Sequence, residues 1–142
     1  VRQLCDRHFG IGADGLLRLT KPQYVADLSE AQVAACDDGD AEWFMDYRNA
    51  DGSLAEMCGN GTRAITLFAQ RCGVASTQVE EPFRLGTRAG VKTLRPLGDV
   101  APYGRDVFRV DMGSWRSASS TASVCNIQLW AHGGGATLTP SR

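Results

Sequence analysis

A four-residue segment of the chain, Cys58-Gly59-Asn60-Gly61, combines a nucleophilic thiol with residues that open a helix. Glycine on both sides of Asn60 relieves crowding by Cβ atoms, and a helical pattern begins directly afterwards. Backbone N–H groups and the positive end of a helix dipole should therefore lie beside the sulfur. These surroundings favour a thiolate, and the same N–H groups can hold a carboxylate or a phosphate. A thiolate beside an anion site suits removal of the α-proton of an amino acid whose carboxylate is held.

The same segment also fits a structural role, in which the glycines form a helix cap around a packed cysteine, and the spacing leaves both interpretations open. Asn49 poses a similar choice, because it begins a turn that runs through an Asp-Gly pair to Ser53. Its side-chain amide could bind a ligand or stabilise its own turn. We expect His8 to pack on Phe9 or Trp43 rather than act as a catalyst, because the sequence fixes no acidic or nucleophilic partner beside it.

Composition and charge narrow the classes of function. The chain has 142 residues, of which 43% are hydrophobic and 22% charged, as in an ordinary globular domain. The 15 Lys and Arg residues nearly balance the 16 Asp and Glu residues, so no bulk charge favours nucleic acid or an anionic membrane as a partner. No window approaches the roughly 20 apolar residues of a membrane-spanning helix. We therefore expect a cytoplasmic chain with a small-molecule substrate, no nucleic-acid partner and no membrane contact.

The cysteines predict neither a disulfide framework nor a metal site. Their number is odd, and no Cys-x-x-Cys pair supplies the usual zinc spacing. Most of them should be small buried apolar residues, so a catalytic role has to come from local context, as at Cys58. The five are Cys5, Cys36, Cys58, Cys72 and Cys125.

The elements expected before the Asn49 turn are short. Apolar runs and alternation indicate strands on either side of a surface insertion at residues 20–41, and Ser29 is a typical start for a short helix inside that insertion. In order, the elements are the end of a helix at residues 1–7, a glycine-rich loop at 8–15, a strand at 16–19, a helix at 28–35 and a strand from 44.

The clearest helix in the sequence covers residues 61–72. Its inward face should consist of residues whose spacing places them on one side of a helix. They are Ala64, Ile65, Phe68 and Cys72. Gly73 should end the helix in the left-handed conformation.

Three later segments alternate apolar and polar residues and are separated by Gly, Pro and Asp, which predicts an antiparallel meander. They are residues 83–85, 91–94 and 107–112. Residues 114–142 lack periodicity and are rich in Ser, Ala and Gly, so we expect a poorly ordered tail there.

Several motifs occur in the order found in one enzyme family. The segments that carry the likeness are residues 5–15, 45–53, 56–63, 86–90 and 110–113. Among them are Tyr47-Arg48-Asn49-Ala50-Asp51-Gly52-Ser53 and Cys58-Gly59-Asn60-Gly61. With these motifs the chain closely resembles the N-terminal half of the diaminopimelate epimerase family, over about residues 1–113.

The resemblance implies an α+β domain in which an antiparallel or mixed sheet wraps around one central helix. This domain would be one half of a two-domain fold, with the active cleft between the halves. The family interconverts LL- and meso-diaminopimelate in lysine biosynthesis without a cofactor. Two cysteines on opposite sides of the α-carbon act as base and acid, so no cofactor is needed as an electron sink. Intact members often form homodimers.

Carried over residue by residue, the resemblance makes Cys58 the catalytic base. Gly59 and Asn60 match residues whose backbone holds the substrate, and Asn49 matches a substrate-binding asparagine. Gly15 falls where some members have a ligand-contacting side chain, so it cannot make that contact. No residue is expected to bind a metal.

The sequence also departs from the family pattern. Nothing before Val1 supplies the family's first strand with its further substrate-binding asparagine. No Cys-Gly-Thr-Gly motif supplies the second cysteine, and Cys125 lacks the following glycine. We expect an N-terminal domain over residues 1–113, an atypical tail over residues 114–142 and no second domain, so the chain alone would be inactive. Two alternatives stay open: another racemase or isomerase of the same fold, and a non-catalytic fragment that pairs with another chain.

Overall fold

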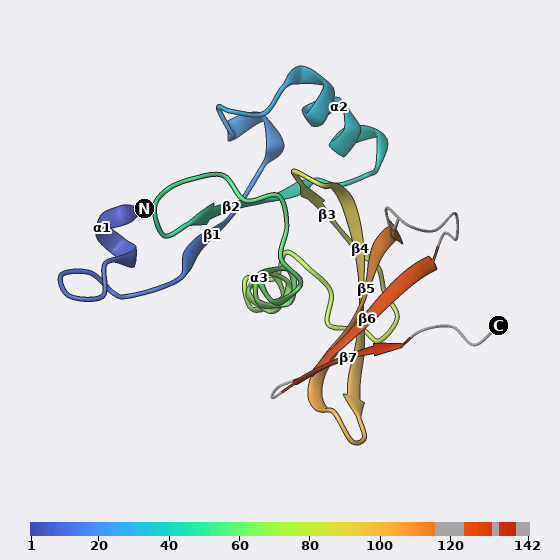
Figure 1. Ribbon diagram of the computed structural model, residues 1–142. Helices are drawn as coiled ribbons and strands as arrows, with labels where there is room; N and C mark the ends of the chain where they lie inside the picture. The colour runs from blue at the N-terminus through green and yellow to red at the C-terminus, as the bar shows by residue number, and fades with distance from the viewer. Residues whose placement is uncertain (116–123, 132–133, 139–142) are drawn as a thin grey trace.

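The computed structural model describes residues 1–115, 124–131 and 134–138, and these form an α+β fold (Figure 1). The strands make one mixed sheet in chain order, in which every neighbouring pair is antiparallel except β2 and β3. The strands are β1 (Gly15–Thr20), β2 (Trp43–Asn49), β3 (Phe83–Thr87), β4 (Gly90–Val100), β5 (Gly104–Trp115), β6 (Val124–Ala131) and β7 (Gly134–Leu138). The helices are α1 (Arg2–Cys5), the short 3-10 helix η1 (Pro22–Tyr24), α2 (Glu30–Asp38) and α3 (Gly59–Arg71).

The helices expected from the sequence are confirmed. Ser29 begins α2 with a capping box: the Gln32 N–H donates to Ser29 Oγ at 3.2 Å, and the Ser29 N–H donates to Gln32 Oε1 at 3.0 Å. Gly73 follows the end of α3 with a φ of 72°, the left-handed cap that glycine tolerates. Within the described part of the chain, no helix has the length and apolarity to cross a bilayer.

The strands expected before residue 113 are also confirmed, and so is the antiparallel pairing of β3, β4 and β5. The sheet as a whole is mixed, because β2 and β3 run parallel. A parallel pair needs a long crossover connection, and here α3 lies in the chain between the two strands.

Strand β2 separates two apolar cores, because its side chains alternate between the faces of the sheet. Met45 belongs to the larger core together with residues of α3, and Phe44 belongs to the smaller core together with residues of α2. The larger core also contains Ile65, Ala69, Phe83, Leu85, Leu94, Phe108 and Val110, and the smaller one Val25, Cys36 and Ala41. Helix α3, seen end-on in Figure 1, contacts β1, β2, β5 and β6.

The inward face of α3 differs from the expected one. Only Ile65 of the expected residues is buried; Ala64, Phe68 and Cys72 are exposed. Buried instead are Gly61, Thr62, Thr66 and Ala69. Threonine can face the core because its hydroxyl donates to the carbonyl oxygen four residues earlier. The Thr62 hydroxyl donates to Cys58 at 2.7 Å and the Thr66 hydroxyl to Thr62 at 2.8 Å.

The region expected to be a poorly ordered tail contains two strands. β6 pairs with β5 and β7 pairs with β6, both antiparallel, so the sheet continues beyond residue 113. Alternating apolar and polar residues at Asn126-Ile127-Gln128-Leu129 are typical of a strand, a signal that the Ser- and Gly-rich composition around it masks. The rest of the tail, residues 116–123, 132–133 and 139–142, lies outside the described residues.

The corrected face of α3 predicts unequal effects of two substitutions. Ile65→Ala should lower the free energy of unfolding by about 2–4 kcal/mol, because it leaves a cavity in the larger core. Phe68→Ala should change it by less than about 1 kcal/mol, because the Phe68 side chain is 53% exposed. Urea unfolding of both variants measures the difference. A larger loss of unfolding free energy for Phe68→Ala than for Ile65→Ala would show that the face expected from the sequence is the buried one.

Candidate active site

The structure places Asn49 at the end of β2, opposite Gly15 of β1. The Asn49 N–H donates to the Ser53 carbonyl at 2.9 Å, and Asn49 Nδ2 donates to Ser53 Oγ at 2.9 Å. Gly52 has a φ of 85°, which the tight turn requires. The side-chain nitrogen of Asn49 therefore stabilises its own turn, the structural role considered from the sequence.

Cys58 is the N-cap residue of α3 and is half-buried. Its carbonyl oxygen accepts hydrogen bonds from the N–H and the hydroxyl of Thr62, at 2.8 and 2.7 Å. Its side chain makes no capping hydrogen bond. Gly59 and Asn60 are the first residues of the helix, where backbone N–H groups have no partner within the helix. The thiol thus lies at the helix end, as the glycine spacing predicted.

The turn after β2 and the start of α3 lie at the same end of strands β1 and β2. After the turn the chain runs back beside β2, and the Ala55 N–H donates to the Tyr47 carbonyl at 3.2 Å. The start of α3 packs on β1: a Cβ atom at Gly61 would lie 3.2 Å from Leu17 Cδ2. Leu17 in turn pairs with Tyr47, two residues before Asn49.

The glycine-rich loop of residues 8–15 supports the Asn49 turn through its backbone. The Asp14 carbonyl accepts from the Ala50 N–H at 3.0 Å. A Cβ atom at Gly15 would lie only 2.6 Å from the Arg48 carbonyl oxygen, so the close approach of the two strands requires glycine there. The close strand approach therefore explains why glycine occupies position 15, whether or not a ligand binds nearby.

His8 does not anchor this loop. Its ring lies 6.5 Å from the ring of Phe9, one of the two contacts expected from the sequence, but Phe9 is 95% exposed. The loop is instead fixed at Asp6, whose carboxylate accepts from the N–H groups of Phe9 and His8 at 2.7 and 2.8 Å. These two hydrogen bonds lower the pKa of Asp6.

The other described cysteines differ from Cys58 in their surroundings. Cys36 is 3% exposed, and burial, together with the charge of Asp37, raises the pKa of its thiol, which disfavours a thiolate. Cys5 is buried as well, and Cys72 is exposed near the end of α3. No cluster of three potential metal ligands occurs among the described residues.

A hollow of about 150 Å³ lies on the exposed side of α3, lined by Arg63, Ala64, Leu67 and Asp106. None of the four candidate site residues lines it. Arg63 and Asp106 are its only charged lining residues in the described part of the chain, and no second carboxylate, thiol or imidazole joins them there, so we assign the hollow no chemistry.

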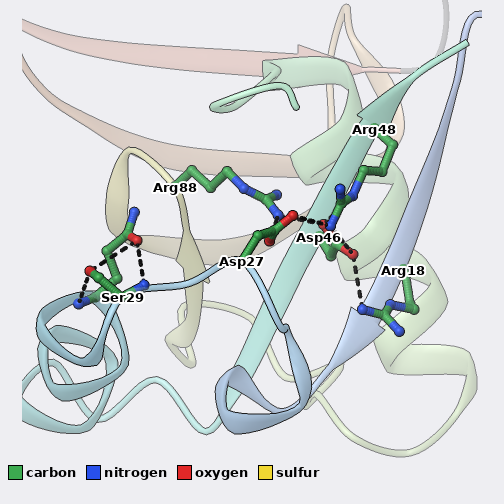
Figure 2. A network of polar contacts seen from close by, with 7 residues as sticks. Arg18, Asp27, Ser29, Asp46, Arg48 and Arg88 are labelled. Atoms are coloured by element: carbon green, nitrogen blue, oxygen red, sulfur yellow. Dashed lines mark hydrogen bonds and ion pairs between the residues drawn. The ribbon is translucent and has the colours of Figure 1, made fainter. Parts of the chain in front are cut away.

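Sequence reasoning missed a group of charged residues on the other face of β2 from the larger core. Asp27, Asp46, Arg48 and Arg88 form a closed set of ion pairs, here called the Asp–Arg ring (Figure 2). Asp27 precedes α2, Asp46 and Arg48 lie on β2, and Arg88 lies in the turn between β3 and β4. The ring therefore joins three segments that are far apart in the sequence.

The two carboxylates of the ring each bind both guanidinium groups. Arg48 Nη2 lies 2.6 Å from Asp27 Oδ2, and Arg48 Nε lies 3.0 Å from Asp46 Oδ1. Arg88 Nη2 lies 2.7 Å from Asp27 Oδ1 and 2.8 Å from Asp46 Oδ1. Arg18 of β1 adds a contact of 3.0 Å to Asp46 Oδ2. The four residues carry two charges of each sign, and this balance allows Asp46 and Arg88 to be buried, with side chains 5% and 7% exposed, while the side chain of Asp27 is 35% exposed.

Burial and pairing act in opposite directions on the carboxylates. Burial raises the pKa of Asp46, but the hydrogen bonds and charges of Arg88 and Arg48 outweigh it, and the pKa lies below its ordinary value. The same balance lowers the pKa of Asp27. Both carboxylates are therefore charged at neutral pH.

Arg88 is the most constrained cation of the ring. Its side chain is 7% exposed, and both of its ion pairs use Nη2. Its Nε and Nη1 atoms are buried without a hydrogen-bond partner among the described residues, and its Cζ lies 5.8 Å from the centre of the Phe44 ring. The guanidinium group thus depends on Asp27 and Asp46 for compensation of its charge.

The family model for diaminopimelate epimerase matches residues 1–117. The chain is 42% identical to the diaminopimelate epimerase of Thermobifida fusca over 118 residues, which are 82% of this chain and 38% of that protein. It is 49% identical to that of Corynebacterium glutamicum strain R over 113 residues, 80% of this chain and 36% of that protein.

These two relatives of the α+β chain, with its cysteine at the glycine-rich start of α3, are both named as epimerases, a class of isomerase. The chain belongs to the diaminopimelate epimerase family. It spans less than two-fifths of the length of the relatives named above.

The Asp–Arg ring predicts a large cost for removal of a buried carboxylate charge. Asp46→Asn should lower the free energy of unfolding by roughly 3 kcal/mol, because Arg88 would stay buried with less compensation. Asp40→Asn is the matched control: the exposed pair of Asp40 with Arg84 spans 3.7 Å and should contribute less than about 0.5 kcal/mol. Equal losses in urea unfolding would show that the ring is not a stabilising core.

The lowered carboxylate pKa values predict a loss of stability in acid. Because Asp46 and Asp27 have lower pKa values in the folded chain than in the unfolded one, their contribution is complete above about pH 4. It is lost as the pH falls through the folded-state values. The free energy of unfolding, measured between about pH 6 and pH 3, should fall less steeply in Asp46→Asn than in the unmodified chain. Parallel curves would contradict the assignment.

Proposed function

We propose that this chain is the Cys58-bearing part of a diaminopimelate epimerase, which interconverts LL- and meso-diaminopimelate in lysine biosynthesis without a cofactor. The observation that carries the proposal is the position of Cys58. It caps the glycine-rich start of α3 at the end of the sheet where the Asn49 turn lies. Membership of the family supports the same activity, since the relatives that match are named for it.

In the proposed reaction the thiolate of Cys58 removes the α-proton of the substrate. The α C–H bond breaks, the proton passes to the sulfur, and the electron pair is delocalised into the substrate carboxylate. The first N–H groups of α3, at Gly59 and Asn60, hold that carboxylate and stabilise the added charge. A second thiol returns a proton to the opposite face, so the centre is inverted.

Asn49 is proposed to bind the substrate through its side-chain oxygen. Its Nδ2 already donates to Ser53 Oγ, so the amide is held in one orientation. Oδ1 is then the atom that can accept from an ammonium group of diaminopimelate. This role is compatible with the turn, because it leaves the hydrogen bond to Ser53 in place.

At the level of the fold, we propose that residues 1–113 form the epimerase-like domain, with α3 as the central helix that the sheet wraps around. Contacts of α3 with β1, β2, β5 and β6 support this arrangement. The chain acts on a small molecule in the cytoplasm, without nucleic acid or membrane, and the intact enzyme is a homodimer. The 142 residues alone do not epimerise, because they carry a single motif cysteine, Cys58.

A second candidate is a non-catalytic fragment that pairs with another chain. Large apolar side chains at the N-terminal end favour it: Val1, Leu4, Phe9 and Ile11 are 39, 49, 95 and 83% exposed. Such a surface is typical of a contact with another protein segment. The motif around Asn49 and Cys58 argues against a third possibility, another racemase of the same fold.

Alkylation of the cysteines tests the site. Iodoacetamide should modify both Cys58 and Cys72, and meso-diaminopimelate should slow the reaction of Cys58 alone, because only that thiol borders the proposed carboxylate site. Cys72, exposed on the same chain, is the internal control. Peptide mapping by mass spectrometry gives both rates. Equal protection of the two cysteines, or protection of neither, would contradict the proposed site.

The proposed need for two bases is tested by exchange of the α-proton. In deuterated water the 142-residue chain should not epimerise diaminopimelate. Chiral analysis and NMR of the recovered amino acid measure inversion and deuterium uptake. Turnover comparable to that of an intact family member would overturn the two-base requirement for this chain.

A further inference from the structure

Arg48 connects the Asp–Arg ring to the Asn49 turn. Its backbone bridges to Leu54, which closes the turn on the far side of Asn49. Its guanidinium group is held by Asp27 at 2.6 Å and by Asp46 at 3.0 Å, and its side chain is only 23% exposed. One residue thus fixes both the strand end and the first residue after the turn.

Strand β2 presents different residues on its two faces. Tyr47 packs against the larger core, on the side of α3. Asp46 and Arg48 lie on the other side, in the ring, because neighbouring residues of a strand point in opposite directions. The ring therefore supports the strand from behind, at the point where it leads into the Asn49 turn.

We propose that Asp27, acting through Arg48, positions the Asn49 turn for substrate binding. Asp27 and Arg48 are then positioning residues, and the surface insertion of residues 20–41 contributes to the site without touching the substrate. The inference rests on the proposed function in one respect, the role of Asn49 toward diaminopimelate.

Charge balance gives the physical reason for this coupling. With Asp27 present, the three guanidinium groups of Arg18, Arg48 and Arg88 face two carboxylates. Without the charge of Asp27, the same three cations converge on Asp46 alone, within a partly buried space of low effective dielectric. Of the two cations that Asp27 binds, Arg48 is the more exposed, at 23% against 7% for Arg88. Arg18 is 49% exposed, and its contact in this group is with Asp46. Arg48 is therefore the group that loss of Asp27 releases, and its movement shifts the turn.

The first test measures the turn itself and does not depend on any ligand. In Asp27→Asn of the 142-residue chain, amide hydrogen exchange at Asn49, Ala50 and Gly52 should become roughly tenfold faster, because these N–H groups donate hydrogen bonds in or beside the turn. Exchange in the middle of α3 should change less. Asp27→Glu, which keeps the charge, should restore the slower rates. Asp40→Asn is the control, because it removes another ion pair between the same insertion and the sheet.

The second test measures the consequence for the ligand. The concentration of meso-diaminopimelate that half-protects Cys58 from iodoacetamide should rise about tenfold in Asp27→Asn and stay unchanged in Asp40→Asn. Unchanged turn exchange in Asp27→Asn would overturn the inference, whatever the ligand does. So would faster exchange with unchanged protection. Absence of protection in the unmodified chain would instead count against the proposed function, and the exchange result would still decide whether Asp27 holds the turn.

Discussion

The buried carboxylate of Asp46 constrains the arrangement of the sheet. A charge in that position is costly unless cations match it. Strands β1 and β2 and the turn between β3 and β4 each supply one, from Arg18, Arg48 and Arg88. The surface insertion of residues 20–41 is joined to these charged residues through Asp27, which pairs with Arg88. On one face of β2, Asp46 and Arg48 follow the buried Phe44, and the other face packs on the larger apolar core. The strand then leads into the turn and the helix that carry the candidate site.

Local sequence signals were sufficient to predict most of the elements, because each depends on neighbours in the chain. The capping box at Ser29, the left-handed Gly73 and the Asp-Gly turn after β2 are of this kind. The parallel pairing of β2 with β3 was harder to predict, since it depends on how α3 returns the chain to the sheet. The prediction of the inward face of α3 was wrong for a different reason. The hydroxyl groups of its threonines donate hydrogen bonds within the helix, so these residues can be buried like apolar ones.

In the candidate site, too, local features could be predicted and contacts between distant segments could not. Glycines around Asn60 were enough to place Cys58 at a helix start, and the Asp-Gly pair was enough to place Asn49 at a turn. The Asp–Arg ring could not be predicted, because Arg88 lies 42 residues from Asp46 and an arginine in a hairpin turn has the appearance of a solvent-exposed residue. One signal was available: Asp46 interrupts the apolar half of β2, where an unpaired carboxylate would be too costly to bury.

The central claim, that the start of α3 binds the carboxylate of diaminopimelate beside the Cys58 thiol, is tested most directly by NMR titration of the labelled chain with meso-diaminopimelate. The account predicts saturable shifts of the Gly59, Asn60 and Gly61 amide resonances, accompanied by shifts at Asn49. Shifts confined to the hollow beside Arg63 and Asp106, or no saturable shift at the start of α3, would contradict it.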